Sequence, residues 1–427
     1  MRVLAVRAPP VSVLEHRLIM RTLRILLGAA LCLLISGAAL ALTVDLHEGE
    51  EGSLVLRLGE AQTPQDQLLA DAFRATSFLS NRGAGRSEYV VPLDSTPGLS
   101  QYLRAARLSG GIYVHLPQLC PRTNCDGVEF VVRARQIMFG GTVAQRSLRI
   151  RDGEARHAAV FFTNEENPRL SDALYIGAEF SDAAAARLRN EFDAIRKSYS
   201  ELIGHDRIAE RGTLVTLARD REGARGFGGD FLNILRLTFH NRRDEPEATI
   251  VDLMVRTYAH EVAHVLHPAR VVEMSPQGRV VSEGSADFLK VLVLRRTGLI
   301  DVAQASSTIS SAYDACQRRR GTKGLLERVA TRVADFREYY DCGMIYYFAL
   351  MFDQSESEGI RIEDAFVTEL ASAFRDAPAM KGENAHCLLM SPACSRSVAI
   401  RMLGDGEALK AMRPWFDERL RGYLGRG

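Results

Sequence analysis

The sequence predicts an α+β protein in which a β-rich N-terminal domain precedes a second domain that contains both strands and helices and ends in a helical region. Two observations carry this prediction. Residues 43–180 hold short runs of β-type residues between clusters of Gly, Pro, Asn and Asp, whereas apolar residues follow a helical period from about residue 182. Beyond Glu247 the pattern is mostly helical. We therefore expect one domain over residues 43–180 and a second over residues 182–427.

The composition is that of an ordinary globular protein. The 427 residues are 46% hydrophobic and 25% charged, which excludes disordered chains, collagen-like chains and proteins with many membrane spans. Residues 1–41 carry five Arg and one Glu, so the 54 basic and 53 acidic side chains become 49 and 52 without them, a net charge of −3. Such a balance does not indicate a surface for polyanions, and we expect no nucleic-acid partner.

The first 41 residues have the pattern of a signal peptide. Arg21 and Arg24 precede an apolar run from Ile25 to Leu42 that contains Ala-Leu-Ala at 39–41, and this order of charged, apolar and small residues is typical of a cleaved leader. Met20 stands just before the arginines and offers an alternative start. An uncleaved membrane anchor is the competing interpretation, because the apolar run has 18 residues. We expect a secreted or periplasmic protein that is membrane-bound only if this segment stays uncleaved.

Six cysteines lie outside this segment, and an even number in an exported chain indicates three disulfides. The local pairs Cys120–Cys125 and Cys387–Cys394 are the natural expectation and leave Cys316 for Cys342, although six cysteines allow about 15 pairings. Free buried thiols are the alternative. A cysteine zinc cluster is not indicated, because the sequence has no C-x-x-C spacing.

The individual elements follow from local patterns. In the first domain, four β-type runs are expected to be strands: Ser53–Leu58, Gly111–Leu116, Val128–Val132 and His157–Thr163. This domain carries no motif with recognisable chemistry. The second domain begins with an amphipathic helix, because five apolar residues are spaced by four and three: Leu188, Phe192, Ile195, Tyr199 and Leu202. A strand over Thr213–Ala218, a glycine-rich loop over Arg221–Asp230 and a strand over Phe231–Phe239 are expected next.

The clearest chemical signal is the string His260-Glu261-Val262-Ala263-His264, which lies in a predicted helix. Side chains four residues apart on an α-helix differ by about 40° in azimuth, so both imidazoles project from one face and can bind one zinc ion. Glu261 points to the side of that pair. There it can take a proton from a water that the zinc activates, rather than bind the metal itself.

Glu283 is the expected third ligand, with eighteen residues between His264 and Glu283. Two histidines and a glutamate leave one position of a four-coordinate zinc site for water, as a catalytic site requires. Asp287 follows Glu283 by one helical turn and is placed to accept the second ring N–H of a histidine ligand, although a surface or capping aspartate is the alternative. The metzincin pattern fails, because it needs a histidine where this chain has Arg270.

These residues resemble the gluzincin metallopeptidases. The eighteen-residue gap and the E-G-x-A-x-F string of Glu283–Phe288 are most similar to the aminopeptidase N family and the glycyl aminopeptidases, and Asp287 is similar to an aspartate of thermolysin. The resemblance covers residues 200–353. It implies a thermolysin-like catalytic domain, in which a mixed sheet accompanies zinc-binding helices, and the activity of a zinc metallopeptidase.

The same resemblance implies a tyrosine in a Y-x-K-G context whose hydroxyl stabilises the oxyanion of the tetrahedral intermediate. Tyr340-Asp341-Cys342-Gly343 lies 57 residues after Glu283, and Tyr340 is the candidate for this role, because a phenol can donate a hydrogen bond to the developing charge. Cys342 stands where the family has lysine. Three other tyrosines are rivals for this role: Tyr339, Tyr346 and Tyr347. All four tyrosines, with Tyr340 included, could instead pack in a core.

Gly228, Gly229 and Asp230 are the candidates for substrate binding. They stand where the resemblance to aminopeptidase N implies a G-x-M-E-N string on an edge strand. An exposed edge strand binds an extended peptide through main-chain hydrogen bonds, and glycine permits close approach. The family's glutamate, which holds the free amino terminus of the substrate, is absent. Asp230 is the candidate substitute, and specificity for chain ends is left open.

The sequence thus predicts an exported zinc metallopeptidase that acts on a peptide or protein substrate. Zinc bound by His260, His264 and Glu283 would lower the pKa of a water whose proton Glu261 removes and passes to the leaving amine, while Tyr340 donates to the oxyanion. One alternative is a catalytically inactive gluzincin-like binding module of the cell envelope, which the missing lysine and glutamate favour. Another keeps the zinc chemistry but hydrolyses a different amide or an epoxide.

Overall fold

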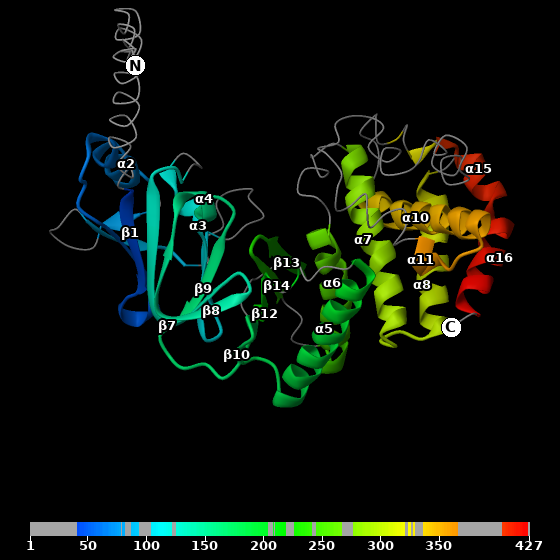
Figure 1. Ribbon diagram of the computed structural model, residues 1–427, viewed down its shortest axis with the longest axis horizontal. Coiled ribbons are helices and arrows are strands. Elements are labelled where there is room, and N and C mark those ends of the chain that lie inside the picture. The colour runs from blue at the N-terminus through cyan, green and yellow to red at the C-terminus, as the bar shows by residue number, and fades with distance from the viewer. Residues whose placement is uncertain are drawn as a thin grey trace, which may run out of the picture.

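The computed structural model describes most of the chain from residue 41 onward, and every structural statement below refers to these parts: 41–77, 79–81, 87–93, 104–121, 125–203, 208, 210–218, 226–240, 245–266, 276–320, 323–325, 328, 336–365 and 404–425. The predicted signal peptide, apart from Ala41, lies outside the described residues, as does the predicted Cys387–Cys394 pair. The described chain is α+β, with strands in its first half and mainly helices in its second half (Figure 1).

Nine of the described strands form the first sheet, in the order β3-β4-β2-β1-β7-β9-β6-β5, and β8 pairs with β7 outside this path. The strands are β1 (Leu42–Glu48), β2 (Leu54–Leu58), β3 (Ser80–Asn81), β4 (Glu88–Val91), β5 (Ala105–Leu108), β6 (Gly111–His115), β7 (Val128–Phe139), β8 (Thr142–Ile150) and β9 (Ala159–Thr163). The four strands expected in this region are therefore confirmed. Side chains alternate across the sheet in β1, where Val44 and Leu46 are buried and their neighbours are partly exposed, whereas β6 and β9 are buried along their whole length.

Short helices accompany the first sheet: η1 (Glu50–Gly52), α2 (Pro64–Arg74), α3 (Leu116–Leu119) and α4 (Asp152–Ala155). The start of α2 is a capping box, in which the Thr63 hydroxyl accepts from the Asp66 N–H and the Asp66 carboxylate accepts from the Thr63 N–H. The first core contains apolar residues of β1, β2, β7 and α2, including Phe73 and Phe130, both fully buried.

A second, mixed sheet has the order β10-β11-β12-β14-β13. Its strands are β10 (Leu170–Ser171), β11 (Leu174–Ile176), β12 (Gly212–Ala218), β13 (Gly226–Phe231) and β14 (Ile234–His240). β11, β12 and β14 run parallel, and β13 pairs antiparallel with β14 at one edge. The strands β10 and β11 thus join this sheet although they precede the helix that begins at Asp182.

One prediction in this region is wrong. Gly226–Asp230, expected in a loop, lies in β13, and Phe231 ends that strand rather than beginning the next, which starts at Ile234. The ladder from Gly226↔His240 to Phe231↔Leu235 explains the difference, because these main-chain hydrogen bonds outweigh the low strand propensity of glycine.

Helices make up the rest of the second half: α5 (Asp182–Ile203), α6 (Glu247–Leu266), α7 (Pro276–Arg296), α8 (Val302–Arg320), α10 (Phe336–Glu358), α11 (Ile362–Ala365), α15 (Gly406–Ala411) and α16 (Arg413–Leu424). The five apolar residues that predicted α5 are all buried in one core with α6, α7 and α10. Phe192 of α5 stacks on Tyr258 of α6, with ring centroids 3.8 Å apart. The helix α5 therefore buries one apolar face, as its sequence period predicts, whereas α10 is buried on nearly all sides from Cys342 to Phe352.

The two sheets meet across a shared apolar cluster. Tyr113, Met138 and Phe161 of the first sheet pack in one cluster with Tyr175, Leu214 and Ile234 of the second. Across the same boundary the Ala159 N–H donates to the Asn233 Oδ1 at 2.7 Å. The β-rich part is therefore packed directly onto the part that carries the zinc motif.

Two of the expected disulfides are present, Cys120–Cys125 in the first part and Cys316–Cys342 between α8 and α10. Within the described ranges, no helix is long and apolar enough to cross a membrane.

Candidate metal centre

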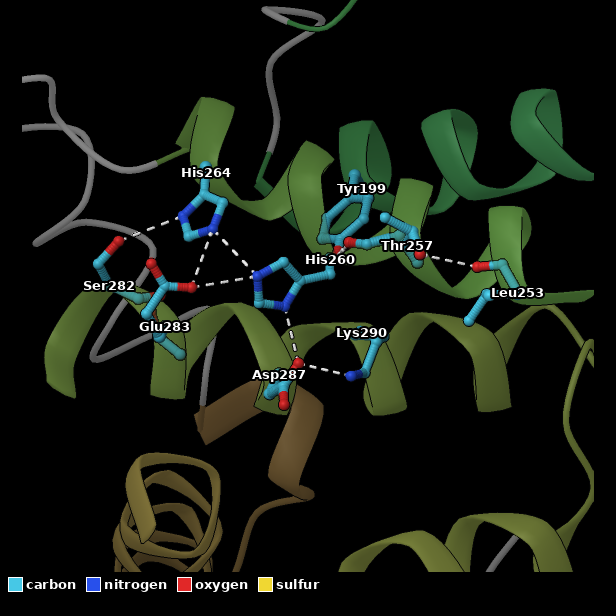
Figure 2. Close-up of polar contacts among 11 residues, drawn as sticks. Tyr199, Leu253, Thr257, His260, His264, Ser282, Glu283, Asp287 and Lys290 are labelled. Atoms are coloured by element: carbon cyan, nitrogen blue, oxygen red, sulfur yellow. Dashed lines mark hydrogen bonds and ion pairs between the residues drawn. The ribbon is translucent and has the colours of Figure 1, made fainter. Parts of the chain in front are cut away.

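The predicted ligands come from two adjacent helices. α6 supplies His260 and His264, and α7 supplies Glu283 (Figure 2). Both helices bury an apolar face in the second core, which includes Ala259 and Val262 of α6 and Ala286 of α7. This packing leaves the opposite face of α6, with its two imidazoles, turned toward the carboxylate on α7. The sequence spacing and the tertiary packing together bring the three side chains to one point.

The spacing of the three donor atoms fits a zinc ion. The Nε2 atoms of His260 and His264 are 3.1 Å apart, and the Glu283 Oε2 lies 3.3 Å from the first and 3.5 Å from the second. Donors bound about 2.1 Å from a tetrahedral ion lie about 3.4 Å from one another. The three distances therefore match three edges of one tetrahedral coordination shell, whose fourth corner is left for another ligand. Among the described residues, His260, His264 and Glu283 form the group whose donor atoms lie close enough together to hold one metal ion.

Asp287 orients the first histidine. Its Oδ1 lies 2.7 Å from the Nδ1 of His260 and also pairs with the Lys290 ammonium (Figure 2). A carboxylate accepts, so the Nδ1 of His260 carries the hydrogen and its Nε2 lone pair is directed at the position between Glu283 and His264. On the other side, the Ser282 hydroxyl lies 3.2 Å from the Nδ1 of His264. Each histidine thus has a partner on the ring nitrogen that faces away from the metal position.

Hydrogen bonds and neighbouring charges shift the pKa values of His260, Glu283 and Asp287. Burial would lower the pKa of His260, but its hydrogen bonds with Asp287 and Glu283 raise that pKa to about 9. Burial opposes ionisation of Glu283, yet hydrogen bonds with both histidines hold its pKa well below the usual value. The pKa of Asp287 is also lowered, because the Lys290 charge and the His260 hydrogen bond outweigh burial. All three shifts come from the close approach of two carboxylates to the histidines, and a divalent cation can stabilise the same negative charge.

Tyr340 is the tyrosine that reaches this site. It lies on α10, partly exposed, and its ring stacks against the His260 ring with centroids 5.5 Å apart. Burial, the charge of Glu283 and a hydrogen bond with Glu283 raise the pKa of the Tyr340 phenol well above its usual value, so it stays protonated. The three rival tyrosines are buried in the second core: Tyr339, Tyr346 and Tyr347. Glu261, partly exposed on α6, is close enough to His260 and Tyr340 for its charge to act on both.

The expected substrate-binding string lies on the edge strand of the second sheet. Gly228, Gly229 and Asp230 belong to β13, whose partner on one side is β14. The backbone placement agrees with the predicted edge strand. The orientation of the Asp230 side chain is outside what the structure describes, so its role as a substitute for the family's glutamate stays a prediction.

Sequence reasoning missed several residues that shape the centre. Lys290 follows Asp287 by three residues, a helical spacing that could have indicated the pair. Ser282 precedes the glutamate ligand directly and could have been tested as a partner of a histidine. The contact of Gly284 with Gly343 of α10 carried no signal in the sequence, because it depends on how closely two helices approach.

Of three comparisons with known proteins, the comparison with solved structures found similarity. No family model matches the chain, and no curated protein sequence matches it. Among solved structures, it is similar to an aminopeptidase N family protein from Idiomarina loihiensis at 11% identity and a TM-score of 0.50, over 81% of this chain and 75% of the other. Also similar is the M1 zinc metallopeptidase from Deinococcus radiodurans, at 14% identity and a TM-score of 0.41, over 89% and 94%. The first likeness shows a common fold, as the predicted resemblance required.

Proposed function

We propose that this chain is a zinc-dependent metallopeptidase that hydrolyses peptide bonds. One observation carries the proposal: the three donor atoms of His260, His264 and Glu283 are 3.1–3.5 Å apart, with a carboxylate and a phenol beside them. A purely structural zinc site has four protein ligands and needs neither a base nor a proton donor. The fold shared with an aminopeptidase N family protein supports the same conclusion.

The donor set suits zinc, since two neutral imidazole nitrogens and one carboxylate oxygen are a common set of ligands in zinc hydrolases. When bound, zinc would polarise the scissile carbonyl and lower the pKa of a water. The chain's own part is to prepare the ligands. Asp287 holds His260 in the tautomer whose Nε2 lone pair faces the metal position, and Ser282 can accept from the Nδ1–H of His264 in the same way.

Two further side chains would move or hold protons. Glu261 is adjacent to His260 in sequence and partly exposed, so its carboxylate can take a proton from the attacking water and then deliver it to the leaving amine. Tyr340 keeps its proton because its pKa is raised by burial and by Glu283. Its hydroxyl is thus a hydrogen-bond donor at neutral pH, which can stabilise negative charge on the oxygen of the scissile carbonyl.

The test is Glu261→Gln in the zinc-loaded protein with a mixed peptide library as substrate. We expect the variant to bind one zinc per chain like the wild type but to lose about 10²–10⁴-fold in kcat, the usual contribution of a general base. Glu201→Gln is the matched control, because Glu201 lies on α5 and pairs with Arg296 at the surface. Unchanged turnover in Glu261→Gln would refute the assigned role.

The same library separates the alternatives. An inactive binding module would retain zinc and bind peptides without cleaving them, and a hydrolase of another amide or an epoxide would leave all peptides intact and unbound. The positions of the cuts distinguish removal of terminal residues from internal cleavage.

We also propose export to an oxidising compartment, which the disulfides Cys120–Cys125 and Cys316–Cys342 support. Cleavage near Ala41, as the sequence predicts, would be seen in the mass of the mature protein.

A further inference from the structure

The three residues that follow Tyr340 each connect α10 to a neighbouring helix. Asp341 forms an ion pair with Arg319 of α8, and Cys342 forms a disulfide with Cys316 of the same helix. Gly343 lies against Gly284 of α7. The part of α10 that carries Tyr340 is therefore fixed to α8 by a covalent bond and a charge pair, and to α7 by direct packing.

The contact between the two glycines brings the backbones of α7 and α10 together. A Cβ atom added to Gly343 would lie 2.6 Å from the Gly284 Cα and 2.9 Å from the Val280 carbonyl oxygen. A Cβ atom added to Gly284 would lie 2.4 Å from the Gly343 Cα. Backbone atoms cannot rotate away as the end of a side chain can, so any larger residue at either position must push the helices apart.

This contact is directly connected to the metal centre at both ends. Gly284 follows the ligand Glu283, and Gly343 lies one helical turn after Tyr340. The Tyr340 ring stacks on His260 with centroids 5.5 Å apart. A small shift of α10 relative to α7 thus changes the distance between the Tyr340 hydroxyl and Glu283, whereas the metal ligands, all on α6 and α7, keep their places.

We propose that Gly284, Gly343, the Cys316–Cys342 disulfide and the Asp341–Arg319 ion pair act together as positioning residues. They hold the Tyr340 hydroxyl at the distance from the metal centre that oxyanion stabilisation requires. The proposal rests on the proposed function. Both sulfurs are deep in the second core, with the two cysteines 1% and 2% exposed, so the disulfide is a permanent part of the packing. A displacement of about 1 Å in a catalytic group can lower the rate by about 10²-fold.

The experiment compares wild type, Cys316→Ala/Cys342→Ala and Gly343→Ala, each also in a Tyr340→Phe background. We expect each change to lower kcat about 10-fold or more, with zinc content and KM unchanged. The affinity for a peptide phosphonate, which resembles the tetrahedral intermediate, should fall by the same factor. In the Tyr340→Phe background the same changes should have little further effect, because the group that they position is already absent. Cys120→Ala/Cys125→Ala, which removes the disulfide of the first part, is the control and should leave kcat and phosphonate affinity unchanged.

Two results would overturn the proposal. One is wild-type kcat and phosphonate affinity in both the disulfide variant and Gly343→Ala. The other is a loss of kcat that is as large in the Tyr340→Phe background as in the wild type. If removal of the disulfide prevents folding, Arg319→Gln decides instead, because it removes only the ion pair. A fall in kcat that disappears in the Tyr340→Phe background supports the proposal, and an unchanged kcat contradicts it. A zinc-loaded wild type that neither cleaves peptides nor binds the phosphonate would refute the proposed function itself, and the inference would fall with it.

Discussion

The two halves of the molecule differ in whether their buried polar groups converge on one point. In the described part of the first sheet and its helices, the buried carboxylate is Asp66, and it serves the local capping box of α2. In the helical half, His260, Ser282 and Asp287 are all buried and lie around one point. Burying such groups costs free energy unless each finds a partner. The comparison teaches that convergence, rather than burial alone, separates a site from a structural contact.

The same contrast holds for charge pairs. Pairs on the first sheet are at the surface, as for Arg149 and Glu129, whose side chains are 69% and 18% exposed. The pair of His260 with Asp287 is 10% and 12% exposed. Solvent screens the first kind and hardly screens the second. Substitutions in the two halves should therefore differ both in size and in what they affect.

The largest effect is expected for His260→Ala. It removes one of the three proposed metal ligands, leaves Asp287 without its histidine partner and leaves Glu283 with His264 alone. We expect elemental analysis of the purified protein to show no stoichiometric zinc. We also expect no peptide hydrolysis, even after zinc is added at micromolar concentration. Retention of one zinc per chain would mean that the metal is held elsewhere, and the contrast between the halves would lose its functional meaning.

A large effect of a different kind is expected in the first sheet for Phe130→Ala. Phe130 lies fully buried on β7, between β1 and the hairpin partner β8. The cavity should lower the free energy of unfolding of this part by about 3–5 kcal/mol, which denaturant titration would measure. Zinc content per folded chain should not change, because the ligands are all on α6 and α7. A coupled loss of zinc would show instead that the shared cluster at Tyr113 and Ile234 transmits the damage.

Features that depend on local sequence patterns were predicted in both halves, whereas features that depend on contacts between distant residues were not. Strands such as β9 and the helix α5 were predicted, since hydrophobic period is a local signal. The convergence of His260, His264 and Glu283 was predicted because their side chains lie on two helices with defined spacing. The local pattern did not predict the strand Gly226–Phe231, which only the resemblance implied, because its stability comes from a ladder with β14 rather than from its own residues. Likewise, nothing near Gly284 in the sequence indicates that Gly343 lies against it.

The smallest effect is expected for Arg149→Ala on β8, which removes the surface pair with Glu129 of β7. Exposed pairs of this kind contribute about 0–1 kcal/mol, because water competes for both ions and the long side chain loses conformational freedom. We expect the free energy of unfolding to change by less than about 1 kcal/mol, with kcat and zinc content unchanged. Repeating the titration in 1 M salt, which reduces the screening length to about 3 Å, should remove the remaining difference from wild type. A difference that persists in high salt would place the contribution of Arg149 in the packing of its aliphatic stem over the sheet, and the halves would then differ less in electrostatics than their exposures indicate.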